Sequence, residues 1–206
     1  ARHVHEELND IPIVDKGFFT LMGNNHFVLD SLRRAEPDRL RETVAWLLRV
    51  TRGYAVKAVN PGGVENWKRG GNARFLDDRV EGYDVTPRQI IAGLVRAVED
   101  LGLPHPLHLH CNDIGHPGNC DTTLETLRSV EGSRIHLTHV QFHSYGKTRK
   151  GSITSRAADI AEYLNEHPEV TIDVGQVVFG PATTMTADAP LAVSYTHLTL
   201  PTNREV

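Results

Sequence analysis

The chain alternates amphipathic segments with short apolar runs. Residues 37–52 place their apolar side chains on one helical face, with Pro37 in the first turn and Gly53 as a stop. Residues 86–102 repeat this pattern, opening with Thr86 and Pro87 as cap and first residue. Two further helices are predicted over residues 122–132, from a capping-box spacing, and over residues 155–165.

The apolar runs between these helices predict strands. They cover residues 11–15, 54–59, 106–111, 134–142 and 170–179, and a long charged loop is expected over residues 64–85. Strand and helix that alternate with short connections are typical of an α/β fold with a parallel sheet covered by helices. A doubly wound sheet and a (β/α)₈ barrel both fit. The barrel is favoured because polar residues cluster at the carboxyl ends of successive strands, where barrel active sites lie.

Composition and charge exclude several classes of protein. The net charge of −4 gives no indication of a nucleic-acid partner, and we expect none. No apolar run approaches the roughly 18 residues that span a bilayer, so no membrane partner is expected. The two cysteines, Cys111 and Cys120, are too few for a disulfide framework, which favours a reducing, cytoplasmic setting.

Seven of the 12 histidines lie between His105 and His143, within or beside apolar strands. Neutral imidazole is the commonest protein metal ligand, so a metal site at strand ends is the first hypothesis. His108 and His110 share one strand face, and His110, nearer the strand end, is the better ligand candidate. His108 is then expected a layer deeper, as a satisfied core histidine.

On the next strand, His139 is the expected ligand. Strand alternation places His136 on the opposite face, toward the helices. His143, where that strand gives way to a loop, is either a ligand or a substrate contact. A single strand histidine is more often structural, and it is two of them on neighbouring strands, together with a buried lysine on the strand before, that bring a metal into consideration.

Lys57 lies inside the apolar run Ala-Val-Lys-Ala-Val, where an unpaired ammonium is costly to bury. Three interpretations stay open: a pair with an interior carboxylate, an exposed sheet edge, or a lowered pKa that lets the amine take up CO₂ and become an anionic metal ligand. The loops that begin at Asn60 and Asn112 are rich in turn formers, which indicates either simple turns or a rim that lines a substrate.

Five stretches together resemble a known family. They are LMGNNHFV (21–28), VKAVNPGG (56–63), LHLHCN (107–112), HLTHVQFHSYG (136–146), and DVGQ (173–176) followed by TTMTAD (183–188). They resemble the A subunits of formylmethanofuran dehydrogenase and of the bacterial formyltransferase/hydrolase complex, within the amidohydrolase superfamily. The resemblance covers residues 1–191, which we expect to form a partial (β/α)₈ TIM-type barrel, about strands 3 to 7. Residues 192–206 look like an irregular tail, of the kind that translated sequencing adapter produces.

The resemblance implies a binuclear zinc site. The superfamily binds metal through a first-strand His-x-His pair, a carboxylated fourth-strand lysine, histidines on the fifth and sixth strands, and an eighth-strand aspartate. Lys57, His110 and His139 match the lysine and the two later histidines, with carboxylated Lys57 as the bridge between the zinc ions. The His-x-His pair and the aspartate have no match in this chain. His3-Val4-His5 has the letters of the pair, but it lies too close to Lys57 for three strand–helix units to fit between them. We therefore expect an internal fragment that is inactive alone.

The implied activity interconverts N-formylmethanofuran with formate and methanofuran in one-carbon metabolism. Zinc would activate water and polarise the formyl oxygen, and the absent aspartate would move the proton. His143, Asn112 and Asn60 are the expected substrate contacts, a methanofuran-type molecule the substrate, and other subunits of the complex the partners. The alternatives are a non-catalytic barrel scaffold and another cyclic-amide amidohydrolase, of the dihydroorotase or hydantoinase type.

Overall fold

The computed structural model describes residues 1–10 and 13–175 of the chain. Its central element is a five-stranded parallel sheet in the order β1-β2-β3-β4-β7. The strands are β1 (Phe19–Leu21), β2 (Ala55–Val59), β3 (Leu107–His110), β4 (Ile135–Leu137) and β7 (Val170–Ile172). A separate antiparallel hairpin joins β5 (Tyr145–Lys147) to β6 (Ile153–Ser155).

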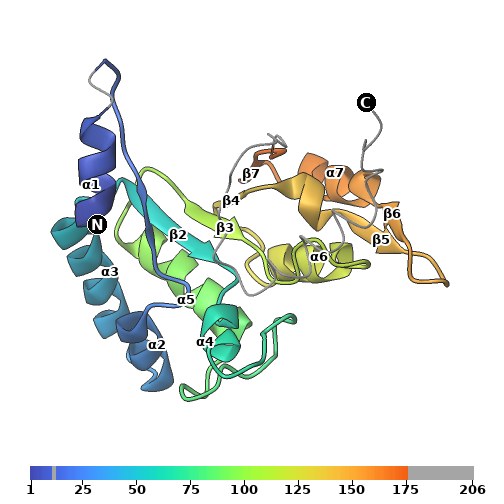
Figure 1. The fold of residues 1–206 in the computed structure, drawn as a ribbon, viewed down its shortest axis with the longest axis horizontal. Helices are drawn as coiled ribbons and strands as arrows, with labels where there is room; N and C mark the ends of the chain where they lie inside the picture. The colour runs from blue at the N-terminus through green and yellow to red at the C-terminus, as the bar shows by residue number, and fades with distance from the viewer. Residues whose placement is uncertain (11–12, 176–206) are drawn as a thin grey trace, which may run out of the picture.

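The strand order decides between the two folds that the sequence allows. Each strand of the main sheet pairs with the next one along the chain, always in the same direction. A doubly wound sheet reverses its strand order at a switch point, and this sheet does not. In Figure 1 the strands follow one another around a curved sheet, with the helices on its outer side. The expected partial TIM-type barrel is confirmed.

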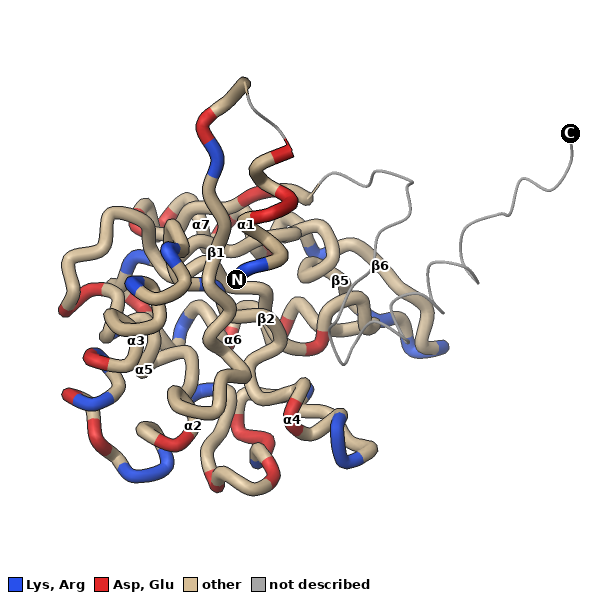
Figure 2. The backbone as a smooth tube through the Cα atoms, turned by 60° about the vertical axis from the view of Figure 1, so that its left-hand side comes forward, with Lys and Arg blue, Asp and Glu red and all other residues tan. Residues whose placement is uncertain are grey.

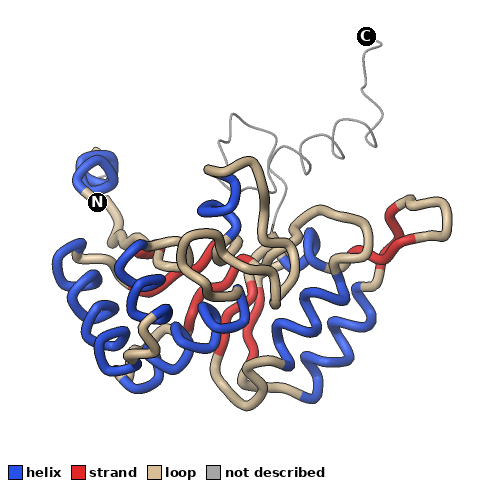
Figure 3. The backbone as a smooth tube through the Cα atoms, turned by 90° about the horizontal axis from the view of Figure 1, so that it is seen from below, coloured by secondary structure: helices blue, strands red, loops and turns tan. Residues whose placement is uncertain are grey.

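Helices between successive strands cover that outer side, as Figure 3 shows from below. The helix α3 packs against both α2 and α5, and α6 packs against α7. The α-helices are α1 (Arg2–Asn9), α2 (His26–Arg33), α3 (Pro37–Thr51), α4 (Gly63–Trp67), α5 (Pro87–Asp100), α6 (Cys120–Arg128) and α7 (Ala157–Glu166), and a 3-10 helix η1 spans Val140–His143. None of the helices in the described ranges is long and apolar enough to cross a membrane.

Local sequence accounts for the starts of α3 and α5, whereas α6 begins at Cys120, two residues before the capping box expected at Thr122. At the start of α5, Gln89 and Thr86 form a capping box in which each side chain accepts from the other's backbone N–H. Pro37 occupies the first turn of α3, and Arg52 ends that helix in the left-handed conformation. The helix α2 was not predicted, although the side chain of Asn25 caps it by accepting from the backbone N–H groups of Phe27 and Val28.

Two predicted strands differ from the structure. The strand expected over residues 11–15 is absent from its described part, residues 13–15, where Ile13 is 88% exposed and has no partner strand. The first strand lies further on, at β1, because that is where the chain pairs with β2. The strand expected over residues 134–142 ends at Leu137, because His139 adopts a φ of 55° and the chain turns into η1. Of the strand expected over residues 170–179, residues 176–179 lie outside the described range, as does the expected tail over residues 192–206.

Charged residues of both signs are interspersed along the chain in Figure 2. This distribution agrees with the small net charge of −4. The two cysteines are free and buried, and burial raises the pKa of Cys111 to about 12. Burial also raises the pKa of Cys120, so both thiols are protonated side chains of the core.

Candidate metal centre at the carboxyl ends of the strands

The two faces of the main sheet differ sharply in chemistry. Side chains on the outer face are apolar and at most 1% exposed: Val56, Ala58, Leu107, Leu109, Ile135 and Leu137. The inner face carries a lateral row of polar residues, because register aligns Lys57 with His108, His108 with His136, and His136 with Thr171. Strand alternation thus sends the apolar residues to the helices and the ionisable residues to the barrel interior.

One step nearer the carboxyl end of β3, His110 meets two other histidines. Its ring centroid lies 5.1 Å from that of His139 and 5.3 Å from that of His143, both edge to face. His139 reaches this position because β4 has already ended and its left-handed backbone turns the chain inward. The structure therefore brings together the two predicted histidine ligands and the histidine that was expected to be a ligand or a substrate contact.

The environment keeps these imidazoles neutral. Burial, followed by the neighbouring charges of His143 and His139, holds the pKa of His110 well below its ordinary value. Burial lowers the pKa of His143 to about 3, and it also lowers the pKa of His139, against the charge of Asp173. Neutral imidazole is the form that binds metal, so the protonation states suit ligands.

Unpartnered nitrogen atoms give an independent test of the fit to a metal. His110 Nε2 and both ring nitrogens of His143 are buried and have no hydrogen-bond partner within the described residues. A buried polar atom left without a partner costs about 1–3 kcal/mol. A buried imidazole nitrogen without a protein partner is what a metal ion satisfies, so His110 fits the implied group.

Lys57 lies one row below His110 on the same inner face. It is half-buried, its Nζ is 5.8 Å from the centre of the Phe19 ring, and burial lowers its pKa while the charge of Asp173 opposes the shift. The exposed-edge interpretation is wrong, because β2 lies between β1 and β3. Within the described ranges no carboxylate forms an ion pair with Lys57, which leaves a lysine with a weakened hold on its proton beside the histidines.

Asp173 was not recognised from the sequence as a site residue. It follows β7, and its carboxylate accepts from the backbone N–H of His139 at 2.9 Å and from Thr138 Oγ1 at 2.5 Å. Burial alone would raise its pKa, but these hydrogen bonds outweigh burial and lower it to about 2. Asp173 therefore stays ionised and holds the segment that carries His139. Its place in the DVGQ stretch was the only indication in the sequence.

The position predicted for His136 is wrong. It was expected to face the helices, but its register with His108 places it on the inner face. The prediction assumed that side chains alternate along one continuous strand that includes His139. The strand ends two residues before His139, at Leu137. The prediction that His108 lies a layer below His110 is confirmed by register, but it is not a satisfied core histidine, since neither ring nitrogen has a hydrogen-bond partner among the described residues.

The two asparagines expected at the substrate rim are buried, with Asn60 0% and Asn112 1% exposed. The amide nitrogen of Asn112 lies within hydrogen-bond distance of Asn60 Oδ1 (2.9 Å), the Pro61 carbonyl (3.0 Å) and the Ala73 carbonyl (2.6 Å). The amide thus joins the loops that follow β2 and β3. The oxygen Oδ1 of Asn112 has no partner within the described residues, so substrate contact by this residue stays a prediction.

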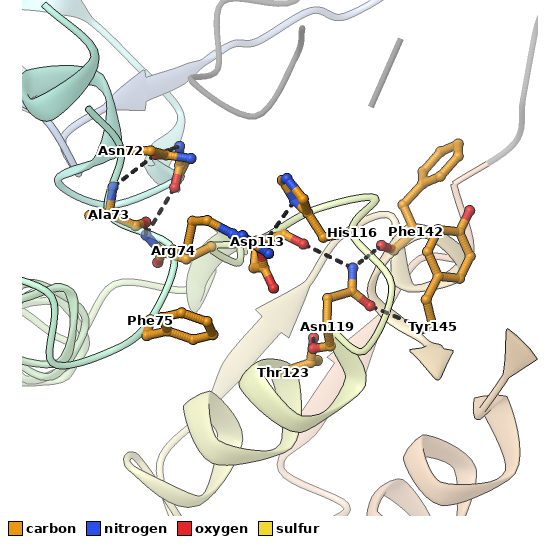
Figure 4. A network of polar contacts seen from close by, with 12 residues as sticks. Asn72, Ala73, Arg74, Phe75, Asp113, His116, Asn119, Thr123, Phe142 and Tyr145 are labelled. Carbon is orange, nitrogen blue, oxygen red and sulfur yellow. Dashed lines mark hydrogen bonds and ion pairs between the residues drawn. The ribbon is translucent and has the colours of Figure 1, made fainter. Parts of the chain in front are cut away.

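A second polar network continues this rim, as Figure 4 shows. Arg74 Nε donates to Asp113 at 2.5 Å, and His116 lies 3.0 Å from the same carboxylate oxygen. Asn119 donates to the carbonyls of Asp113 and Phe142 and accepts from the backbone N–H of Tyr145. The loops after β2, β3 and β4 are therefore connected into one layer above the histidines.

The fold and the site together define an α/β-barrel protein with a candidate metal centre at the carboxyl ends of its strands. The chain belongs to the amidohydrolase family, whose model matches residues 1–205.

Two relatives extend the likeness. Protein FwdA of Methanocaldococcus jannaschii is 48% identical over 93% of this chain and 36% of its own length. The A subunit of the formyltransferase/hydrolase complex Fhc of Methylorubrum extorquens is 41% identical over 91% of this chain and 35% of its own length. These relatives confirm the resemblance drawn from the sequence motifs.

A solved structure agrees with them. The crystal structure of the FhcABCD complex from Methylorubrum extorquens, in complex with methylofuran, contains a chain that matches with a TM-score of 0.82 and 42% identity. The match covers 85% of this chain and 33% of that chain. The present chain thus spans about a third of the length of the relatives it matches.

Proposed function

We propose that this chain is part of a zinc-dependent amidohydrolase subunit that interconverts N-formylmethanofuran with formate and methanofuran. The observation that carries the proposal is that the rings of His139 and His143 contact the ring of His110, one row above Lys57, in a chain 48% identical to FwdA and 41% identical to the A subunit of Fhc. The two histidine ligand candidates are neutral imidazoles that meet at one place.

The proposed roles follow from position. His110 and His139 would each give a ring nitrogen to zinc, and Lys57, carboxylated on Nζ, would supply the bridging anionic ligand. Its lowered pKa supports this role, because only the neutral amine reacts with CO₂. Bound zinc supplies a Lewis acid and an activated water at neutral pH. Asp173 keeps the backbone of His139 in place through its hydrogen bond to that N–H.

The substrate side of the proposal rests on the rim. His143 is fully buried beside His110, with both nitrogens available to the formyl group or its amide. Asn112 and Asn60 hold the loops above it, and the free Oδ1 of Asn112 is an acceptor for a substrate N–H. The partners are the other subunits of a formyltransferase/hydrolase-type complex, and the compartment is the cytoplasm, which suits two free thiols.

The test uses the purified complex that contains this chain. We expect bound zinc and formate release from N-formylmethanofuran, both lost on His110→Ala and on Lys57→Ala, and both kept on His105→Ala, a nearby histidine bonded to the Pro106 carbonyl. A scaffold role would leave formate release unchanged in all three variants. Ring opening of hydantoins without formate release would identify the cyclic-amide alternative instead.

A further inference from the structure

The hairpin of β5 and β6 carries a group of positive charges that the proposed function does not use. Lys147, Arg149 and Lys150 lie at or beside the turn of this hairpin, and all three residues are exposed. In Figure 1 the hairpin extends away from the main sheet and its helices, and Figure 2 shows Lys and Arg at its end. These three residues are called the basic tip below.

The basic tip has no counter-charge on this chain within the described residues. No carboxylate there forms an ion pair with Lys147, Arg149 or Lys150. Arg88 and Arg156, by contrast, each contact two carboxylates. Like charges that lie close together repel one another, and a facing negative surface removes that cost. The basic tip is therefore complementary to a group of anions that this part of the chain does not supply.

The shape of the turn is fixed by its own hydrogen bonds. The backbone N–H of Thr148 donates to the carbonyl of Ser152 at 2.9 Å, and the N–H of Ser152 donates to Thr148 Oγ1 at 2.9 Å. The N–H of Gly151 donates to the carbonyl of Thr148, and its φ of 85° is one that glycine adopts without strain. A loop that is already ordered loses less conformational entropy when it binds a partner.

The base of the hairpin is tied to the rim of the barrel. The N–H of Tyr145 donates to Asn119 Oδ1 at 3.0 Å, and the N–H of Arg156 donates to the carbonyl of Ser144 at 2.8 Å. An isolated two-stranded hairpin is only marginally stable, and the strands of this one bury a single residue, Gly146. The anchors at its base therefore keep in place an arm that lies outside the core and presents positive charge.

We propose that the basic tip binds an acidic segment of a partner subunit, an inference that takes the existence of that subunit from the proposed function. Complementary charges on two proteins speed their association and fix how they are oriented. Nucleic acid fits less well, because a nucleic-acid site is a basic stripe or patch on a basic domain, and this chain has a net charge of −4. A membrane surface fits less well, because anionic lipid is typically bound by clusters of about four to eight basic residues.

The first test applies a carbodiimide to the purified complex that contains this chain, since this reagent joins a lysine amine to a carboxylate in direct contact. We expect Lys147 or Lys150 to be joined to an Asp or Glu of a different subunit, as identified by mass spectrometry of the peptides. Lys68 is the matched control, because it already pairs with Glu65 of its own chain at 2.6 Å and should be joined to it. The proposal is overturned if the basic tip is joined only to its own subunit, or to nothing in a sample in which Lys68 has reacted.

Charge reversal provides a second measurement. Arg149→Glu/Lys150→Glu should weaken association with the partner subunit by about tenfold or more, and the effect should shrink at high salt. Arg49→Glu/Arg128→Glu is the matched control, because it changes the net charge equally at two exposed arginines that have no ion pair among the described residues. This control should leave association unchanged, and so should Arg149→Lys/Lys150→Arg, which keeps both charges at the tip.

Circular dichroism establishes that each variant is folded before its association is compared. Equal association of the parent and the folded Arg149→Glu/Lys150→Glu variant would overturn the proposal. So would binding of single-stranded RNA or of phosphatidylserine vesicles that this variant loses while its assembly stays intact. If the complex releases no formate from N-formylmethanofuran but Lys150 is still joined to another subunit, only the proposed function is contradicted.

Discussion

The imidazole rings of His110 and His139 meet edge to face with centroids 5.1 Å apart, although one residue ends β3 and the other follows β4. His110 reaches this point as the last residue of β3. His139 reaches it from a left-handed turn after β4 has ended. The candidate centre therefore depends on a turn as much as on the sheet.

Lys57→Ala is expected to lose bound zinc, because it removes the proposed bridging ligand. A short carboxylic acid such as acetate, added at high concentration, should restore part of the metal content by occupying the space of the missing side chain. The measurement is the zinc content of the dialysed complex, with and without acetate. Lys57→Arg keeps the charge but cannot carry a carboxylate on an amine, and serves as the control. Full zinc content in Lys57→Ala without acetate would contradict the bridging role.

Gly175→Ala is expected to displace His139. Gly175 has a φ of 77°, and an added Cβ would lie 2.8 Å from the Cα of His139. The left-handed backbone alone costs an alanine about 1 kcal/mol, and the backbone clash adds to that. Gly151→Ala is the matched control, with a φ of 85° and no atom within 4 Å. Urea denaturation should show a larger loss for Gly175→Ala, and zinc affinity should fall in that variant only. Equal losses in the two variants would mean that Gly175 does not support His139.

Asn112→Asp is expected to destabilise the rim by several kcal/mol, because it replaces a donor that faces three oxygen atoms with an acceptor. Asn112→Ala should cost less, about 1–3 kcal/mol, because it leaves those oxygens unpaired without repulsion. Guanidinium unfolding checks both values. Asn9→Asp, at an exposed helix end, is the control and should change the unfolding free energy by less than about 0.5 kcal/mol. If Asn112→Asp leaves the free energy of unfolding unchanged, the amide does not hold the loops together.

The metal-free chain is expected to lose stability as the pH falls below 6.5. Burial lowers the pKa of both His108 and His143 to about 3, so between these pH values the unfolded chain binds protons that the folded chain does not. The free energy of unfolding should therefore fall by up to about 1.4 kcal/mol per pH unit for each of the two histidines.

Unfolding is measured between pH 7 and 5. This avoids the lower pH range in which Asp173, with a pKa of about 2, begins to lose its charge and its contribution to stability. His143→Gln should reduce the slope, whereas His3→Gln, in an exposed helix, should not. If the free energy of unfolding has the same slope against pH in the parent chain and in both variants, His143 takes up its proton in the folded chain as it does in the unfolded one.

Much of the fold could be predicted from local pattern. The helices α3 and α5 have apolar residues on one face and cap or stop residues at their ends, so their positions were predicted to within a residue or two. The helix α2 was missed because its stability comes from packing against α3 and α5, not from periodicity. The β5–β6 hairpin was missed because each of its strands is only three residues long. The ligand candidates Lys57, His110 and His139 were identified from family motifs, and their clustering is seen only in the structure.

What the sequence by itself determined is which residues could be buried and which of them carry chemistry. The alternation in β2 and β3 separates the apolar face from the ionisable one, since side chains alternate along any strand. What only the tertiary structure decided is which residues of different strands share a row, and where β4 stops. That register places His108 opposite His136 and brings Asp173 to both His136 and His139. The physical reason is that the pattern within one strand fixes which side chains share a face, whereas register also depends on hydrogen bonds to a strand far away in the chain.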